Sequence, residues 1–282
     1  MADAKEVSPL NLTKIYPKNS FFHPALSADF IYLFHLIPGM VRGEELRVRI
    51  KDYFSFEKQE LSILIPAIFL TAFIFSFRDW GIADFNFWAG LENYIVVVII
   101  IGISFFARFS WQKIYALKDG YRAEFKGWWL GILIALVLAV ISKGHLPLVL
   151  IGGVASSLMI HHRLGEFRYG FSYLDNAKIS FQGIVANLFL ALLFSIGLYF
   201  APESYFFSKG LWLNWIMALC SALPLPQLDG LNIYFGSRPL YYSALAIIAI
   251  FGILLLTGTQ LGLILAVFVT AISVIVGVLL EP

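Results

Sequence analysis

The stretch FFARFSWQKIYALKDGYRAEF, from Phe105 to Phe125, decides the fold because it continues an apolar run of membrane-spanning character. It carries Arg108, Gln112 and several further basic residues. A charged side chain at the end of a membrane helix is costly in hydrocarbon, so it must reach the water interface or a partner inside the protein. The interpretation of the rest of the chain depends on whether Arg108 reaches the water interface or a partner inside the protein.

The composition places the chain among membrane proteins. Of its 282 residues, 60% are hydrophobic and only 13% are charged, and several apolar runs are long enough to span a bilayer. The formal net charge of +2 argues against a nucleic-acid partner, because phosphate binding needs a concentrated basic surface. The single Cys220 cannot form an intramolecular disulfide.

Residues 1–60 are predicted to form an N-terminal cytoplasmic or interfacial segment. Their first residues lack the apolar core of a secretory signal peptide. Apolar and basic residues alternate from Leu46 to Lys51, which is typical of a half-exposed strand or a strip on the membrane surface. We favour the strip, whose basic side chains would face anionic head groups.

Residues 61–282 are predicted to form the transmembrane domain of an all-α polytopic membrane protein with six or seven transmembrane helices. Ser55 is a candidate N-cap for the first span, and Pro66 is expected to bend it. The third apolar run is short for a full crossing. The apolar runs are residues 61–77, 94–107, 128–142, 179–200, 210–226, 241–256 and 261–280.

The distribution of charge predicts the sidedness of the chain. The loop after the first span holds Asp79, Asp84 and Glu92 against one basic residue, whereas the stretch after the second span is basic. The positive-inside rule therefore places the second stretch and the N-terminus in the cytoplasm. Strand-like pieces around Leu158 and Tyr169, in Gly-rich sequence, predict a re-entrant β-hairpin-like insertion covered by other protein.

Three local motifs lie between residues 50 and 245. QGIVANLFLALLF places Gly183 and Asn187 one helical turn apart, and SALPLPQLDGLNIYF contains Pro224, Asp229 and Gly230. The third motif lies in the opening stretch and follows the segment FSFEKQEL. Its residues are Lys113, Gly120, Ala123, Glu124, Phe125 and Trp128.

These motifs resemble those of the site-2 protease family of intramembrane zinc metalloproteases, in its archaeal branch. The first looks like the family's GPxxN helix, the second like its LDG segment, and the third follows the spacing of HELAHK, YG, AEF and Trp. The resemblance implies a family-like core at about residues 94–235, with Asp229 at the position of a zinc ligand. It also implies a groove for a transmembrane client near Gly183, Asn187, Pro224 and Gly230.

The zinc-binding motif itself is missing. An HExxH box places two imidazoles on one helix face and a catalytic Glu between them. Its five positions here read Arg108, Phe109, Ser110, Trp111 and Gln112. A guanidinium cannot coordinate zinc and a phenyl ring cannot act as a general base. Asp229 is thus the only retained ligand position, and we expect no metal and no catalytic residue.

The resemblance then predicts a contact. Arg108 should occupy the vacated metal position and pair with Asp229, with Gln112 completing the hydrogen bonding, because an unpaired carboxylate at that depth is costly. The alternative is that Arg108 extends to the cytoplasmic interface.

Other polar residues have simpler interpretations. Adjacent His161 and His162, with Glu166 and His145 nearby, are not expected to bind metal, because neighbouring strand residues point to opposite faces. The charged residues from Lys113 to Lys126 are interpreted as a solvated helix end or loop, in which Glu124 can contact Arg122. For Asn187 the simplest role is an interhelical hydrogen bond.

Two functions remain open, with a third in the background. The first is a proteolytically inactive site-2-protease-like protein that acts as a scaffold or client-binding subunit for membrane-protein partners. The second is an active intramembrane metalloprotease with zinc in an unorthodox site. A transporter or channel is the third, although few polar residues thread the predicted spans.

Overall fold

The computed structural model describes residues 43–81, 85–158, 172–256 and 260–279. The chain divides into two compact units, Met1–Met40 and Val41–Pro282, and every described residue belongs to the second. Tyr169, His161, His162 and Glu166 lie outside the described residues, so the predictions made for them stay predictions.

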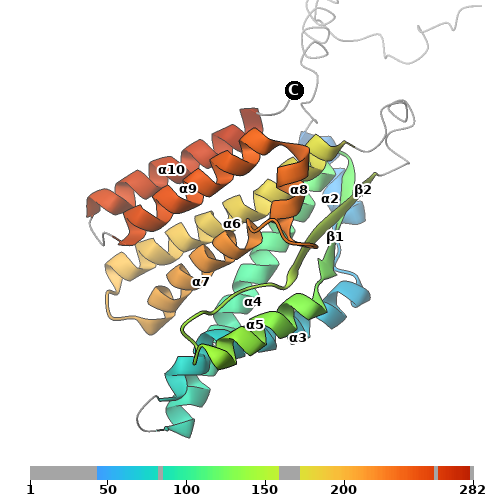
Figure 1. Ribbon diagram of the computed structural model, residues 1–282. Helices are drawn as coiled ribbons and strands as arrows, with labels where there is room; N and C mark the ends of the chain where they lie inside the picture. The colour runs from blue at the N-terminus through green and yellow to red at the C-terminus, as the bar shows by residue number, and fades with distance from the viewer. Residues whose placement is uncertain (1–42, 82–84, 159–171, 257–259, 280–282) are drawn as a thin grey trace, which may run out of the picture. The chain divides into compact units, whose positions relative to one another are not determined.

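The second unit is mostly helical, with one two-stranded sheet (Figure 1). Its elements in chain order are α2 (Gly43–Tyr53), α3 (Lys58–Ser76), the 3-10 helix η2 (Phe77–Trp80), α4 (Phe87–Lys118), β1 (Tyr121–Gly127), α5 (Trp129–Ile141), β2 (Gly152–Leu158), α6 (Tyr173–Phe200), α7 (Tyr205–Ser221), α8 (Asp229–Gly236), α9 (Arg238–Leu256) and α10 (Gln260–Leu279).

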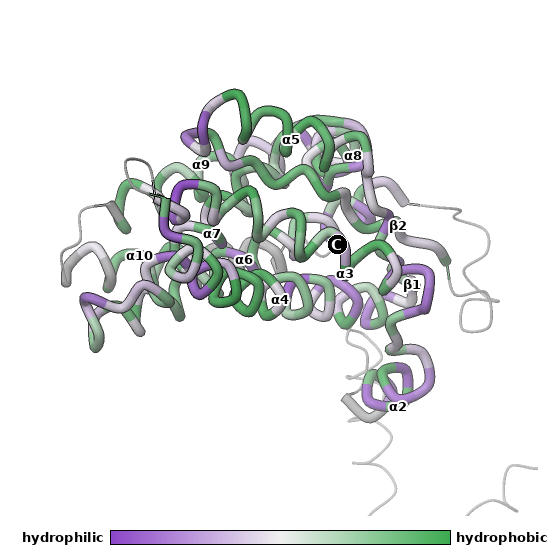
Figure 2. The backbone as a smooth tube through the Cα atoms, turned by 90° about the horizontal axis from the view of Figure 1, so that it is seen from below, coloured by the Kyte–Doolittle hydropathy of each residue, from purple (hydrophilic) through white to green (hydrophobic). Residues whose placement is uncertain are grey.

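Four helical segments of the described chain are long and apolar enough to cross a membrane. They are Lys58–Trp80, Phe87–Lys118, Tyr173–Phe200 and Arg238–Leu255. Helix α5 is apolar but shorter, as the sequence predicts for the third run. Figure 2 shows hydrophobic residues along these helices, whereas α2 is largely hydrophilic. The four segments indicate a membrane-embedded protein.

The strand or strip predicted over Leu46 to Lys51 is instead part of helix α2. Arg49 lies one turn after Glu45, and their side chains form an ion pair at 2.5 Å. The buried Arg49 Nη1 also donates to the carbonyls of Leu117 (3.0 Å) and Lys118 (3.1 Å) at the end of α4. These bonds cap the end of α4, where the next helical turn is missing, and the Leu117 carbonyl also accepts the Gly120 N–H at 3.2 Å. A contact between such distant segments cannot be inferred from an alternation of six residues.

The N-cap prediction for α3 is also wrong by two residues. Glu57, not Ser55, precedes the helix, and the Glu57 N–H donates to the Glu60 carboxylate at 2.8 Å. This bond is one half of a capping box, in which the side chain of the third helical residue accepts the N–H of the residue that precedes the helix. Pro66 lies inside α3, as expected.

Strands β1 and β2 pair in antiparallel register, from Tyr121 opposite Leu158 to Gly127 opposite Gly152. The strand predicted near Leu158 is therefore present, but its partner lies before α5 in the chain. The stretch that forms β1 was expected to be a helix end or loop, and that expectation is wrong. Its alternating burial, with Tyr121, Ala123 and Phe125 inward, is typical of a half-buried strand.

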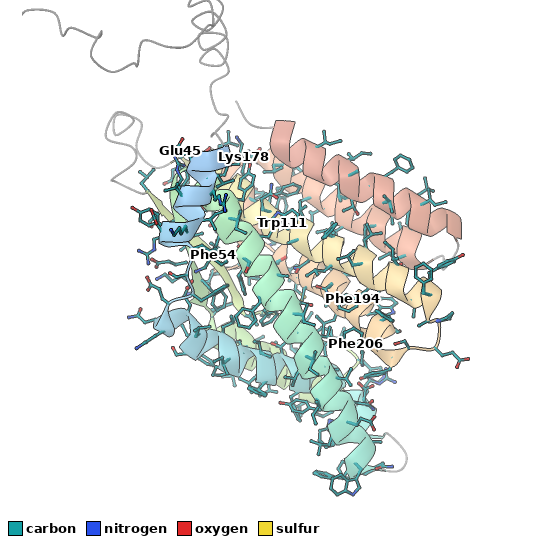
Figure 3. All side chains as sticks on the ribbon, turned by 180° about the vertical axis from the view of Figure 1, so that it is seen from behind. Glu45, Phe54, Trp111, Lys178, Phe194 and Phe206 are labelled. Carbon is teal, nitrogen blue, oxygen red and sulfur yellow. The ribbon has the colours of Figure 1, made fainter. Side chains whose placement is uncertain are left out.

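Helix α6 runs through the centre of the unit and packs against α4, α7, α8 and α10. Helices α6 and α7 form an antiparallel hairpin across a short connection, and the rings of Phe194 and Phe206 lie 5.5 Å apart between them (Figure 3). Every residue of α6 from Ala177 to Leu188 is buried. This burial places any polar residue of that segment inside the protein.

Candidate functional site

An ion pair at the meeting point of α4 and α8 forms the centre of the candidate site. Arg108 Nη2 lies 2.6 Å from Asp229 Oδ2, and the two side chains are 2% and 0% exposed. The predicted pairing of Arg108 with Asp229 is confirmed, and the alternative in which Arg108 extends to the interface is wrong. Arg108 lies ten residues before the end of α4, within the packed part of the helix.

Gln112 completes the pair from the next turn of α4. Its Nε2 lies 3.0 Å from Asp229 Oδ2, and residues four apart share one helix face. The same amide nitrogen lies 3.4 Å from the carbonyls of Ile179 and Ser180 on α6. The predicted role of Gln112 is therefore confirmed, and the side chain also joins α4 to α6.

The second oxygen of Asp229 receives a backbone hydrogen bond. The N–H of Val154 in β2 donates to Asp229 Oδ1 at 3.2 Å. Among the described residues, the carboxylate thus accepts hydrogen bonds from side chains of α4 and from the backbone of β2. The guanidinium of Arg108 balances its charge. Charge-assisted bonds of this kind are short and strong, and a carboxylate this deeply buried requires them.

Two glycines allow the polypeptide to approach the carboxylate closely. A Cβ atom at Gly183 would lie 2.4 Å from Gln112 Nε2 and 3.0 Å from Asp229 Oδ2. A Cβ at Gly153 would lie 2.8 Å from Asp229 Oδ1. Both positions therefore need glycine for steric reasons. The motif that contains Gly183 lies against the ion pair, as expected if the motifs converge.

The other residues predicted to line the groove differ in how deeply they are buried. Gly230 packs against the Ala222 carbonyl, which would lie 2.3 Å from an added Cβ, whereas Pro224 is exposed in the turn before α8. Asn187 is fully buried, but neither of its amide atoms has a hydrogen-bond partner among the described residues. The interhelical hydrogen bond predicted for Asn187 is therefore not found there.

Phe109 is a packing residue where the resemblance would require a catalytic carboxylate. Its ring is fully buried and lies 4.5 Å from the ring of Phe125 in β1. The Arg108 guanidinium lies 5.7 Å from the centre of the same ring, within the range of a cation–π contact. The Phe109 ring therefore packs against β1 and against the Arg108 guanidinium, and it has no group that can accept a proton.

A second buried ion pair joins Lys113 to Glu60, and sequence reasoning missed it. Lys113 Nζ lies 2.7 Å from Glu60 Oε2 and 2.8 Å from the Ser55 carbonyl, above the Phe56 ring. The other Glu60 oxygen accepts the Phe125 N–H at 2.6 Å. The solvated position expected for Lys113 is therefore wrong. The available signals were a carboxylate at the start of an apolar helix and the occurrence of both residues in the segments that carry the resemblance.

Farther out, the charged residues of β1 behave as predicted. Glu124 lies 3.5 Å from Arg122 Nε and 3.4 Å from Lys126 Nζ, and Arg122 also pairs with Glu57. These side chains are partly exposed, so each ion pair stabilises the fold by about 1 kcal/mol or less.

The residues at the centre do not fit a zinc ion. Zinc in proteins is held by thiolate, imidazole and carboxylate groups, whereas Arg108 and Gln112 direct N–H donors at Asp229. The described residues contain no group of three His, Cys, Asp or Glu side chains arranged to hold a metal. His145 is exposed, and its Nδ1 lies 2.7 Å from the Ser142 carbonyl.

Comparison with known proteins gives one distant relative. A protein of Methanocaldococcus jannaschii, described as a "putative zinc metalloprotease", is 24% identical over 181 residues, which cover 63% of this chain and 84% of the relative. The chain is similar to a metalloprotease-like protein. No family model matches the chain, and no solved structure matches it.

Proposed function

We propose that this protein is a proteolytically inactive relative of the site-2 proteases that acts as a scaffold or client-binding subunit for other membrane proteins. The observation that supports this most directly is the Arg108 guanidinium bonded to Asp229 at 2.6 Å. In this proposal, the organic cation replaces the metal as the partner of the one carboxylate that remains.

The loss of activity follows from three substitutions at one site. Arg108 and Gln112 stand where the resemblance requires imidazole ligands, and Phe109 stands where it requires the general base. Hydrolysis of a peptide by a metalloprotease needs a metal-bound water and a group that accepts its proton. The three side chains supply neither, so the proposed protein needs no cofactor.

The proposed topology has six or seven membrane spans. Helices α3, α4, α6, α7, α9 and α10 provide six, and the short α5 is the seventh in the form of the proposal in which it crosses the bilayer. The N-terminus and β1 lie on the cytoplasmic side, because basic residues gather at that end of α4. The proposed re-entrant insertion is the stretch after α5 that contains β2, for which β1 is the partner strand. Protein encloses it because its backbone cannot face lipid unpaired.

The proposed contact for a client is the sheet with the adjoining groove. An extended segment can add to a sheet edge through main-chain hydrogen bonds. Val154 N–H already bonds Asp229, so the inner end of β2 is tied to the ion pair. The outer end carries the exposed Ala155 and Ser157, which are the residues closest to an incoming chain in this arrangement.

A cross-linking experiment tests the binding role. A photoreactive residue at Ser157 in the full-length protein, expressed in native membranes, should capture a discrete membrane protein. The matched control places the same residue at Phe268, which is 62% exposed on α10, where it should capture mainly lipid. Equal capture of the same proteins from both positions would contradict binding at the sheet.

The alternative function is an active intramembrane metalloprotease, favoured by the description of the distant relative. The purified protein should then cleave a transmembrane reporter, and the Asp229→Asn variant should lose that cleavage. In the proposed function neither protein cleaves, although both still bind partners.

A further inference from the structure

Three neighbouring helices carry buried polar atoms that make no hydrogen bond to Asp229. Ser104 on α4, Asn187 on α6 and Asn214 on α7 are each 0% exposed. Within the described residues, Ser104 Oγ, Asn214 Oδ1 and both amide atoms of Asn187 have no hydrogen-bond partner. Arg108 Nε belongs to the same group. Proteins pair nearly all such groups, either with protein or with ordered water.

The packing of α4 on α6 brings these atoms to one side of the ion pair. Ser104 lies one turn before Arg108, and Asn187 lies one turn after Gly183, so each shares a helix face with a residue at the pair. The two faces meet where Gly183 approaches Gln112. The spacing therefore places Ser104 and Asn187 one turn from the residues that contact Asp229, on the facing sides of α4 and α6.

Helix α7 encloses the same region from another side. Contacts between Phe207 and Gly197, and between Gly210 and Phe194, fix the antiparallel register of α6 and α7. Two helical turns beyond the contact of Phe194 with Gly210, the same register places Met217 of α7 opposite Asn187 of α6. Met217 is 0% exposed, and Asn214 lies on its face of α7.

We propose that ordered water occupies this interior, bound by Asn187 together with Ser104 Oγ and Arg108 Nε. Water suits the site because it both donates and accepts hydrogen bonds, and Asn187 offers two donors and one acceptor oxygen. A buried water needs two to four polar partners, and these three residues provide them. The ion pair then belongs to a hydrated network that reaches toward α7.

Radiolytic hydroxyl labelling tests the proposal with the full-length protein in detergent or nanodiscs. Radicals formed from bound water oxidise reactive side chains beside it, and the register of α6 and α7 places Met217 opposite Asn187. Its oxidation, corrected for intrinsic reactivity, should exceed that of Phe251 several-fold, although both are 0% exposed. Labelling of Met217 no higher than that of Phe251 would overturn the proposal.

Two controls separate bound water from bulk solvent. An impermeant radical scavenger should suppress labelling of Trp88, which is 77% exposed, and leave Met217 labelled; loss of both overturns the proposal. The Asn187→Leu variant should reduce Met217 labelling several-fold, whereas the polar Asn187→Ser variant should retain most of it. If Asn187→Leu fails to fold, the scavenger result on the unaltered protein decides.

Discussion

Arg108 and Asp229 form a buried ion pair between α4 and the start of α8. A buried ion pair gives little net stability, because desolvation offsets the attraction, but removing one partner leaves a buried charge uncompensated. The two side chains at 2% and 0% exposure fall in this class. Each is therefore expected to depend on the other.

The first prediction is a double-mutant cycle on this pair. Arg108→Met and Asp229→Asn should each lower the free energy of unfolding by about 3–5 kcal/mol, because each leaves one charge buried alone. The double variant buries neither charge and keeps an oxygen for Val154, so its loss should be smaller than the sum. Thermal or denaturant unfolding in detergent measures all four proteins.

The exposed pair Lys126 and Glu124, at 3.4 Å, is the matched control. Lys126→Met and Glu124→Gln should each cost about 1 kcal/mol or less. Strictly additive losses at Arg108 and Asp229 would contradict a direct pairing of the two.

The second prediction concerns the close approach at Gly183. Gly183→Ala places a methyl group 2.4 Å from Gln112 Nε2, so Gln112 must move, and we expect a loss of about 1–3 kcal/mol in unfolding free energy. Gly102→Ala on α4 is the control, because nothing lies within 4 Å of its Cβ. It should gain about 0.5–1 kcal/mol through helix preference. Equal effects of the two substitutions would argue against a packed site.

At the scale of elements, Glu60 and Lys113 tie the start of α3, the end of α4 and the edge of β1 together. Glu60 accepts bonds from Lys113, from Phe125 N–H and from Glu57 N–H. One carboxylate thus joins a helix cap, an ion pair and a sheet edge. Such a shared group should make the three elements unfold together.

The third prediction follows from this connection. Glu60→Gln keeps the shape of the side chain but removes the charge that balances Lys113, so we expect a loss of about 3–5 kcal/mol in unfolding free energy. Hydrogen exchange at the Phe125 amide should accelerate markedly. The control variant, Glu124→Gln, should leave that exchange rate nearly unchanged. Unaltered exchange in Glu60→Gln would mean that β1 does not depend on the carboxylate.

The elements that sequence predicts well are those specified by local pattern. The seven predicted apolar runs correspond to α3, α4, α5, α6, α7, α9 and α10, and the four segments long and apolar enough to cross a membrane come from α3, α4, α6 and α9. Composition and length are sufficient to predict such helices. The sheet was predicted only in part, since pairing of β1 with β2 depends on residues separated by the whole of α5. Helix α2 was mistaken for an extended strip, because its capping of α4 through Arg49 is a tertiary contact.

The contacts of the candidate site could likewise be predicted from the sequence only in part. Helical spacing places Arg108 and Gln112 on one face, and the resemblance supplied their partner Asp229, so this contact was predictable. The pair of Lys113 with Glu60 was not, because the resemblance includes both residues but does not say that side chains 53 positions apart are in contact. Among the described residues the Asn187 amide has no hydrogen-bond partner. This too has no signature in sequence, because it depends on which polar groups the surrounding helices present.

At the scale of the whole molecule, the fourth prediction concerns sidedness. In a background where the buried Cys220 is replaced by Ala, a cysteine at Trp88 should react with an impermeant thiol reagent on intact cells. A cysteine at Lys126 should react only after permeabilisation, because the basic end of α4 is expected in the cytoplasm. Both positions are well exposed, at 77% for Trp88 and 62% for the Lys126 side chain. The reverse pattern would invert the proposed topology.

The metal content of the purified full-length protein tests most directly the proposal that the Arg108 guanidinium takes the place of a metal beside Asp229. Elemental analysis after purification without chelators should find zinc far below one ion per chain, and the same low level in the Asp229→Asn variant. Stoichiometric zinc that disappears in Asp229→Asn would contradict the account.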